Sequence, residues 1–128
     1  MKTTLGKLLW EIRFEAHENQ KEMAKRLNIP PQYLSAIEQG KKSTTEQFIK
    51  KVAKEYLLPY SSILALSRAR LQNMDKLSIQ CTKLSQEQKE SLISLFLQLD
   101  NISQYDWQRI NAIAKRTENA KLSIEQRK

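Results

Sequence analysis

Residues 20–39, QKEMAKRLNIPPQYLSAIEQ, constrain the fold most strongly, because they contain two short helical patterns separated by a sharp break. Asn19, followed three residues later by Glu22, predicts the start of the first helix. The break spans residues 28–30, and Pro31 suits the first turn of the next helix, where its missing N–H would be unpaired anyway. The segment therefore predicts two helices joined by a tight turn.

The side chains of this segment predict which face of the second helix points outward. Two helices that cross steeply need a small residue at their contact, which Ala24 supplies, and Asn28 tolerates the positive φ that the turn requires. Leu34 and Ile37 lie on one side and predict its buried face. The opposite face carries short or amide side chains, namely Gln32, Ser35, Ala36 and Gln39. Such a face suits the major groove of DNA, because Gln can form two hydrogen bonds to adenine and small residues permit close approach to bases.

The rest of the chain is helical in pattern, so we expect an all-α fold with two regions. Residues 1–74 predict five helices, the first over 4–16 and the fourth capped by Thr44 or Thr45. Residues 75–128 predict a short strand at 77–82, where apolar and polar side chains alternate, and then a helical hairpin over 86–99 and 104–118 with a frayed end.

Charge and composition favour an anionic partner and argue against an enzyme. The net charge is +8, and the first 74 residues hold 13 Lys and Arg against 7 Asp and Glu. One Cys, Cys81, and one His, His17, cannot form a zinc site, and no nucleophile–base set or phosphate-binding glycine loop is present. We expect no catalytic residue, metal or cofactor. With no signal peptide and no apolar run of membrane-spanning length, we expect a cytoplasmic protein without membrane contact.

Residues 5–70 resemble the Cro/repressor-type, or XRE-like, helix-turn-helix family. The stretch at 33–42, YLSAIEQGKK, is especially close to family usage, and the matching positions are Arg13, Gln20, Ala24, Leu27, Leu34, Ile37, Glu38 and Gly40. The resemblance implies a five-helix lambda-repressor-like DNA-binding domain. The chain differs from the family at His17 and Glu18, where Gly and Leu are usual, at Asn28, where Gly is usual, and at Pro31, where a base-contacting residue is common.

The resemblance also implies roles for individual residues. Arg13 and Glu38 match an ion pair between the first and third helices, although they would also fit a surface pair worth about 0–1 kcal/mol. Together with Ala24, Asn28, Leu34 and Ile37 they form the structural set of the motif. The resemblance implies base contacts for Gln32, Ser35 and Ala36. We add Gln39 to this set because it lies on the same outward face. Phosphate contacts are assigned to Asn19, Gln20, Lys21, Tyr33, Lys41 and Lys42, although a solvated loop is the alternative for the two lysines.

The C-terminal region carries more apolar side chains than two isolated helices would bury. Packing on the five-helix domain is one interpretation. The other is self-association, since proteins of this kind bind two half-sites about 34 Å apart as twofold dimers. We expect a homodimer built from residues 75–118, with these candidate contacts: Leu77, Ile79, Leu92, Phe96, Leu99, Trp107 and Ile110.

These observations predict a sequence-specific regulator of transcription that binds double-stranded DNA. We expect a repressor of bacterial or phage type that binds a palindromic operator as a homodimer, although the sequence is equally consistent with recruitment of polymerase. The alternative is the antitoxin of a toxin–antitoxin pair, in which residues 75–128 bind a protein partner and DNA binding serves autoregulation.

Overall fold

The structure, a computed structural model, describes residues 3–126, and within them it is all-helical. Its contacts divide the chain into two units that meet between Asp75 and Lys76. The first unit contains five helices, which are α1 (Thr4–Glu15), α2 (Gln20–Arg26), α3 (Pro31–Glu38), α4 (Glu46–Glu55) and α5 (Tyr60–Gln72). The second contains α6 (Gln86–Leu97), a 3₁₀ turn η1 (Leu99–Asn101) and α7 (Gln104–Gln126).

Side-chain caps fix where the helices of the first unit begin. Asn19 accepts a hydrogen bond from the Glu22 amide at 2.8 Å, and the Glu22 carboxylate accepts one from the Asn19 amide at 2.9 Å. This confirms the predicted capping box of α2. Thr45, one of the two predicted caps, accepts from the Phe48 amide at the start of α4. Local polar chemistry therefore sets these boundaries.

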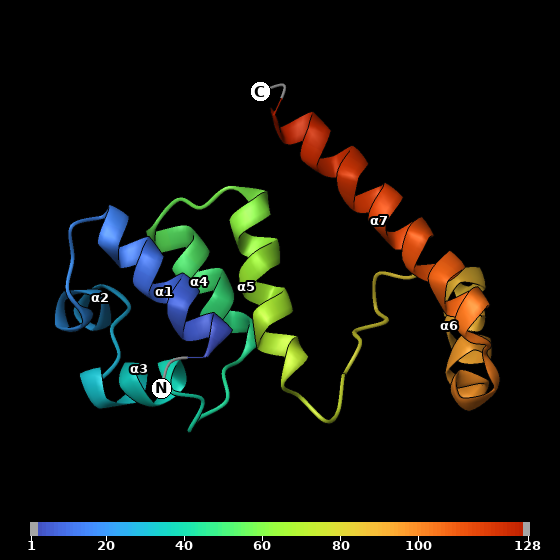
Figure 1. Cartoon of the computed structure of the whole chain (residues 1–128), viewed down its shortest axis with the longest axis horizontal. Helices are drawn as coiled ribbons and strands as arrows, with labels where there is room; N and C mark the ends of the chain where they lie inside the picture. Colours follow the sequence, from blue (N-terminus) through green and yellow to red (C-terminus); the bar gives the residue numbers. More distant parts are fainter. Residues whose placement is uncertain (1–2, 127–128) are drawn as a thin grey trace. The chain divides into compact units, whose positions relative to one another are not determined.

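The helices of the first unit surround a core of aliphatic side chains. Figure 1 shows α1 with α2 and α3 on one side and α5 on the other, and α1 contacts all three. The buried set is Leu5, Leu9, Met23, Ala24, Leu27, Leu34, Ile37, Phe48, Ile49, Val52, Leu66 and Ala69. Because α2 and α3 are only seven and eight residues long, this shared core holds them in place.

The predicted strand at 77–82 is wrong. No strand occurs anywhere in residues 3–126, and this stretch is irregular, with Leu77 and Ile79 about two-thirds exposed. The alternating pattern is present, but a strand also needs a partner strand for its backbone N–H and C=O groups. No extended segment within the described residues supplies one.

The C-terminal helices also differ in length from their predictions. Instead of reaching residue 99, α6 ends at Leu97 and continues into η1. The second helix continues to Gln126 rather than ending near residue 118. Residues 118–126 are polar, but they contain good helix formers such as Ala, Lys, Leu and Glu and no Gly or Pro. Polarity alone therefore does not end α7.

The second unit buries none of its described side chains. From residue 76 to residue 125 every side chain is exposed or half-buried, including Phe96 at 69% and Leu97 at 67%. In the helical hairpin, residues such as Leu92 and Ile110 are only half-buried. Among residues 3–126, no helix is long and apolar enough to span a membrane.

Candidate nucleic-acid interface

The turn between α2 and α3 depends on one left-handed residue. Asn28 has a φ of 57°, which Asn tolerates better than most side chains. The next amide, of Ile29, donates to the carbonyl of Ala24 at 3.0 Å and closes the end of α2. Ala24 itself is fully buried. The sharp turn is thus made by the residues that the sequence indicated.

The core fixes which face of α3 points outward. Leu34 and Ile37 are 0% and 1% exposed. On the other side, Gln32 and Gln39 are exposed, and Ser35 and Ala36 are half-buried. A shallow hollow of about 370 Å³ lies over this face, lined by Gln20, Pro31, Gln32, Ser35, Ala36, Gln39 and Lys41. The four predicted base-contacting residues therefore share one uncharged, accessible surface, defined here as the α3 outer face.

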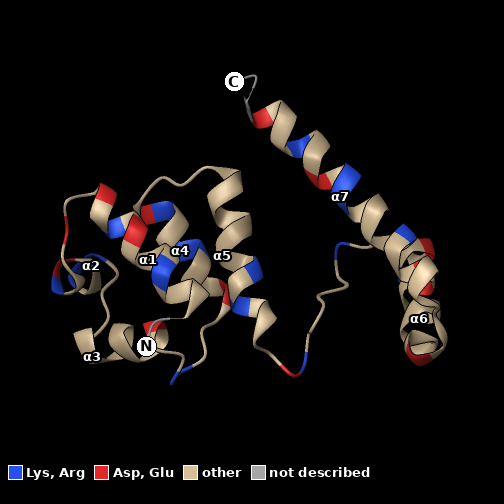
Figure 2. Ribbon diagram, viewed as in Figure 1, with Lys and Arg blue, Asp and Glu red and all other residues tan. Residues whose placement is uncertain are grey.

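Two of the side chains on the α3 outer face are joined to each other. The Gln39 amide donates to the Ser35 hydroxyl at 3.1 Å. Among residues 3–126 the Gln32 side chain has no hydrogen-bond partner, and its neighbour Pro31 has no polar side chain. Because α3 carries no Lys or Arg (Figure 2), its outer face offers hydrogen-bonding groups and no positive charge.

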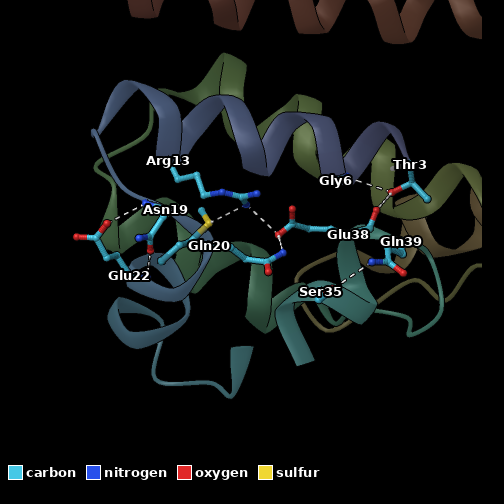
Figure 3. Close-up of polar contacts among 10 residues, drawn as sticks. Thr3, Gly6, Arg13, Asn19, Gln20, Glu22, Ser35, Glu38 and Gln39 are labelled. Atoms are coloured by element: carbon cyan, nitrogen blue, oxygen red, sulfur yellow. Dashed lines mark hydrogen bonds and ion pairs between the residues drawn. The ribbon is translucent and has the colours of Figure 1, made fainter. Parts of the chain in front are cut away.

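A buried ion pair locks α3 to α1 (Figure 3). Arg13 donates to the Glu38 carboxylate at 2.8 Å, and the side chains are 6% and 1% exposed. The predicted pairing is confirmed, but its interpretation as a surface pair is wrong, because both charges are removed from water. Gln20 also donates to the same carboxylate oxygen, Oε2, at 3.1 Å. One carboxylate thus joins α1, α2 and α3.

The carbonyl of Glu38 makes a second connection to the start of α1. The Thr3 amide and hydroxyl both donate to it, at 3.0 and 3.1 Å. A Cβ placed on Gly6 would clash with this carbonyl oxygen and lie 3.0 Å from its carbon. Sequence reasoning did not single out Thr3 or Gly6, although a glycine inside a helix is a visible sign of close packing.

The residues predicted to contact phosphate flank the α3 outer face. Asn19, Gln20 and Lys21 stand at the N-terminus of α2, where amide groups and the helix dipole favour anions, although the Asn19 side chain already caps the helix. Lys41 and Lys42 follow α3, in the loop that Figure 2 shows in blue below α3. Lys42 Nζ lies 4.7 Å from the centre of the Tyr33 ring, so these two predicted residues are neighbours.

A second polar cluster, missed in the sequence, ties α2 to α4. Arg26 Nε lies 3.4 Å from Glu18 Oε2, and the Arg26 guanidinium stacks 4.5 Å from the Tyr56 ring centre. Burial, and next the Glu18 carboxylate, raises the pKa of the Tyr56 phenol well above its ordinary value. No spacing rule links residues 18, 26 and 56, because only the packed helices bring them together.

The predicted dimer contacts lie in the second unit. Leu77 and Ile79 are in the irregular segment, Phe96 and Leu99 are exposed on or beside α6, and Trp107 on α7 is 38% exposed. Leu92 and Ile110 are half-buried. This set and the α3 outer face therefore belong to different units.

Two short helices at a tight turn, a buried anchor and an uncharged outer face together define a helix-turn-helix DNA-binding protein. Comparison with known families agrees, because the helix-turn-helix family matches residues 19–61. That segment is a Cro/repressor-type, or XRE-like, domain, and the chain is a DNA-binding regulator of transcription. No curated protein and no solved structure gives a match.

Proposed function

We propose that the chain is a repressor that binds a palindromic operator as a homodimer. The observation that carries this proposal is the α3 outer face, because its orientation is set by the burial of Leu34 and Ile37. With Glu38 held by both Arg13 and Gln20, α3 has little freedom to rotate. A recognition surface must be rigid to discriminate bases, since a loose side chain loses geometric selectivity.

In the proposed complex, α3 enters the major groove and contacts base edges. Gln32, Ser35, Ala36 and Gln39 contact bases, and the hydrogen bond from Gln39 to Ser35 orients both side chains beforehand. Phosphates on either side are held by the N-terminus of α2, with Asn19, Gln20 and Lys21, and by the loop beyond α3. In that loop Lys41, Lys42 and Tyr33 make the backbone contacts.

Dimerisation through residues 75–128 accounts for the exposed apolar side chains of the second unit. A two-helix hairpin that buries no side chain lacks a core of its own, and Phe96, Leu97 and Ile113 are each more than half exposed. A second copy that covers them would bring two α3 helices to one duplex, as recognition of two half-sites requires. Residues 1–74 then serve as the DNA-binding domain and residues 75–128 as the dimerisation region.

Repression is the simplest outcome of such binding, because an occupied operator excludes polymerase from an overlapping promoter. A second function is favoured by the same exposed side chains, since they equally fit a different protein. In that case the chain is an antitoxin that neutralises its partner and represses its own promoter. A neighbouring reading frame encoding a small toxin-like protein would favour the antitoxin.

Selection of bound duplexes from a random oligonucleotide pool tests DNA recognition and symmetry together. We expect a palindromic consensus with half-sites one helical turn apart. A consensus without internal symmetry would contradict the dimer, and enrichment of no sequence at all would contradict specific recognition.

Sedimentation of the full chain tests the dimer separately. We expect a dimer at micromolar concentration and a monomer after Phe96→Ser with Leu97→Ser. Leu57→Ser is the matched control, because Leu57 is 88% exposed but belongs to the first unit. A monomeric wild-type chain would refute the proposed assembly, and the same oligomeric state for the intact chain and for a truncation after residue 74 would refute dimerisation through residues 75–128.

A further inference from the structure

A cavity in the first unit lies away from the α3 outer face. It has a volume of about 590 Å³ and is formed by the C-terminal half of α1, the turn between α4 and α5, and the first turns of α5. Its apolar lining includes Leu8, Ile12, Leu58 and the fully buried Leu66, and Ser61 and Ser62 also line it. This volume falls within the range of roughly 300–1,000 Å³ that is typical of sites for small organic molecules.

One rim of the cavity is negatively charged. Glu11 and Glu15, one helical turn apart on α1, both line it and are both exposed. Neither has an ion-pair partner within residues 3–126. Like charges at this spacing repel each other, so a cation placed between them would be attracted by both carboxylates. The rest of the chain is strongly basic, which makes this acidic rim distinctive.

The mouth of the cavity holds an unusual leucine. Leu57 has a φ of 51° and is 88% exposed. Leu57 follows the end of α4 in the left-handed region, and the next amide, of Leu58, donates to the carbonyl of Ala53 at 3.0 Å. Its position in the turn places an apolar side chain beside the opening, where it can cover the apolar part of a bound molecule.

We propose that this cavity binds a small organic cation. The charged group lies between Glu11 and Glu15, and the apolar body packs against Leu8, Ile12 and Leu58. An inorganic cation would leave the apolar floor unused, and an organic anion would be repelled by the rim. The combination of an apolar floor with two unpaired carboxylates therefore selects a molecule that is both apolar and positively charged.

The position of the cavity also connects it to the DNA-binding motif. Tyr56 lines the cavity and stacks on Arg26 of α2, while Ile12 on the floor directly precedes Arg13, which holds Glu38 of α3. A ligand in the cavity would therefore contact Tyr56, which stacks on Arg26, and Ile12, which precedes Arg13 in α1. We expect ligand binding to change operator affinity, and operator binding to change ligand affinity by the same factor. This consequence rests on the proposed function.

A matched ligand series tests the site in the full chain by ¹⁵N NMR titration at constant ionic strength. The probes are 3-phenylpropylammonium, the neutral 3-phenylpropanol and the anionic 3-phenylpropanoate, which share one apolar body. We expect the ammonium to bind with a dissociation constant on the order of millimolar, the alcohol more weakly and the carboxylate weakest. The largest amide shifts should fall in the C-terminal half of α1, the α4–α5 turn and the first turns of α5, with smaller ones in α2 and α3.

Variants then assign the selectivity to the rim. Glu11→Gln with Glu15→Gln should weaken ammonium binding roughly tenfold and leave the alcohol unchanged, which shows that the cavity itself is intact. Glu87→Gln with Glu90→Gln in α6 changes the net charge equally and should alter neither titration. Equal affinity for ammonium and carboxylate, largest shifts at residues that do not line the cavity, or no binding at all would overturn the proposal.

The regulatory consequence has a separate measurement. The ammonium should alter the operator affinity of the wild-type chain but not that of the Glu11→Gln, Glu15→Gln variant. An unaltered affinity would refute the coupling. Failure to bind any duplex would contradict the proposed function alone, because the NMR titration requires no DNA.

Discussion

Gln20 Nε2 donates a hydrogen bond to Glu38 Oε2 at 3.1 Å, so the first residue of α2 is joined directly to the last residue of α3. The same oxygen accepts from Arg13 on α1. The Gln20 side chain also borders the hollow over the α3 outer face. The carboxylate that joins the two helices is therefore one contact away from the α3 outer face (Figure 3).

Removing the charge of Glu38 should destabilise the first unit severely. Glu38→Gln leaves Arg13 buried without a counter-charge, and we expect the free energy of unfolding to fall by about 3–5 kcal/mol in urea titrations. Replacing both residues by Met should recover most of the loss, because no uncompensated charge remains. Glu46→Gln, at an exposed pair with Lys50, should change little. A mild effect of Glu38→Gln would mean that water reaches the pair.

Adding a methyl group at Gly6 should force α1 away from α3. The new Cβ of Gly6→Ala would overlap the Glu38 carbonyl, which is backbone and cannot rotate away. Overpacking of this kind costs about 1–3 kcal/mol or more, which thermal unfolding would measure. Lys7→Ala, one residue further along the same helix, is the control. Unchanged stability would show that the two helices separate freely.

Removing the amide of Gln32 should weaken binding selectively. We expect Gln32→Ala to cost about 1–3 kcal/mol on the selected operator and to relax the preference at one base pair. Competition binding with operators altered singly at each position would measure this. A uniform loss on every sequence would instead identify Gln32 as a backbone contact. Gln86→Ala, in the second unit, serves as the control.

Removing the two lysines after α3 should weaken binding to every duplex. Lys41→Ala with Lys42→Ala should lower the slope of log affinity against log salt concentration by at most about two units. Lys50→Ala with Lys54→Ala on α4 provides the same change in net charge at a different place. An identical slope in wild type and the Lys41, Lys42 variant would place these lysines off the DNA.

Stability should depend on Tyr56 at alkaline pH. The Tyr56 phenol has an ordinary pKa of 10.0, which burial raises in the folded chain. The unfolded chain therefore loses the phenolic proton first, so this contribution to stability is full below pH 10 and is lost as pH rises toward the folded pKa. Tyr56→Phe should flatten the decline in unfolding free energy from about pH 10 upward. Tyr105→Phe, which changes an exposed ring on α7, should leave it unaltered.

Short-range chemistry made much of the first unit predictable. The capping box of Asn19 and Glu22, the left-handed Asn28 and the three-residue spacing of Leu34 and Ile37 all act over one or two turns of helix. Their geometry is therefore contained in local sequence. The strand at 77–82 failed for the opposite reason, because strand formation depends on a partner that local alternation does not specify.

By itself, the sequence determined the helical pattern, the tight turn and the polar character of the surface opposite Leu34, because these depend on backbone propensity and helical period. Packing alone decided that Arg13, Gln20 and Glu38 share a dehydrated carboxylate and that Arg26 meets Tyr56. It also decided that an acidic rim borders an apolar cavity. Burial and long-range contacts arise when helices distant in the chain are brought together, and no local sequence pattern specifies which helices will meet.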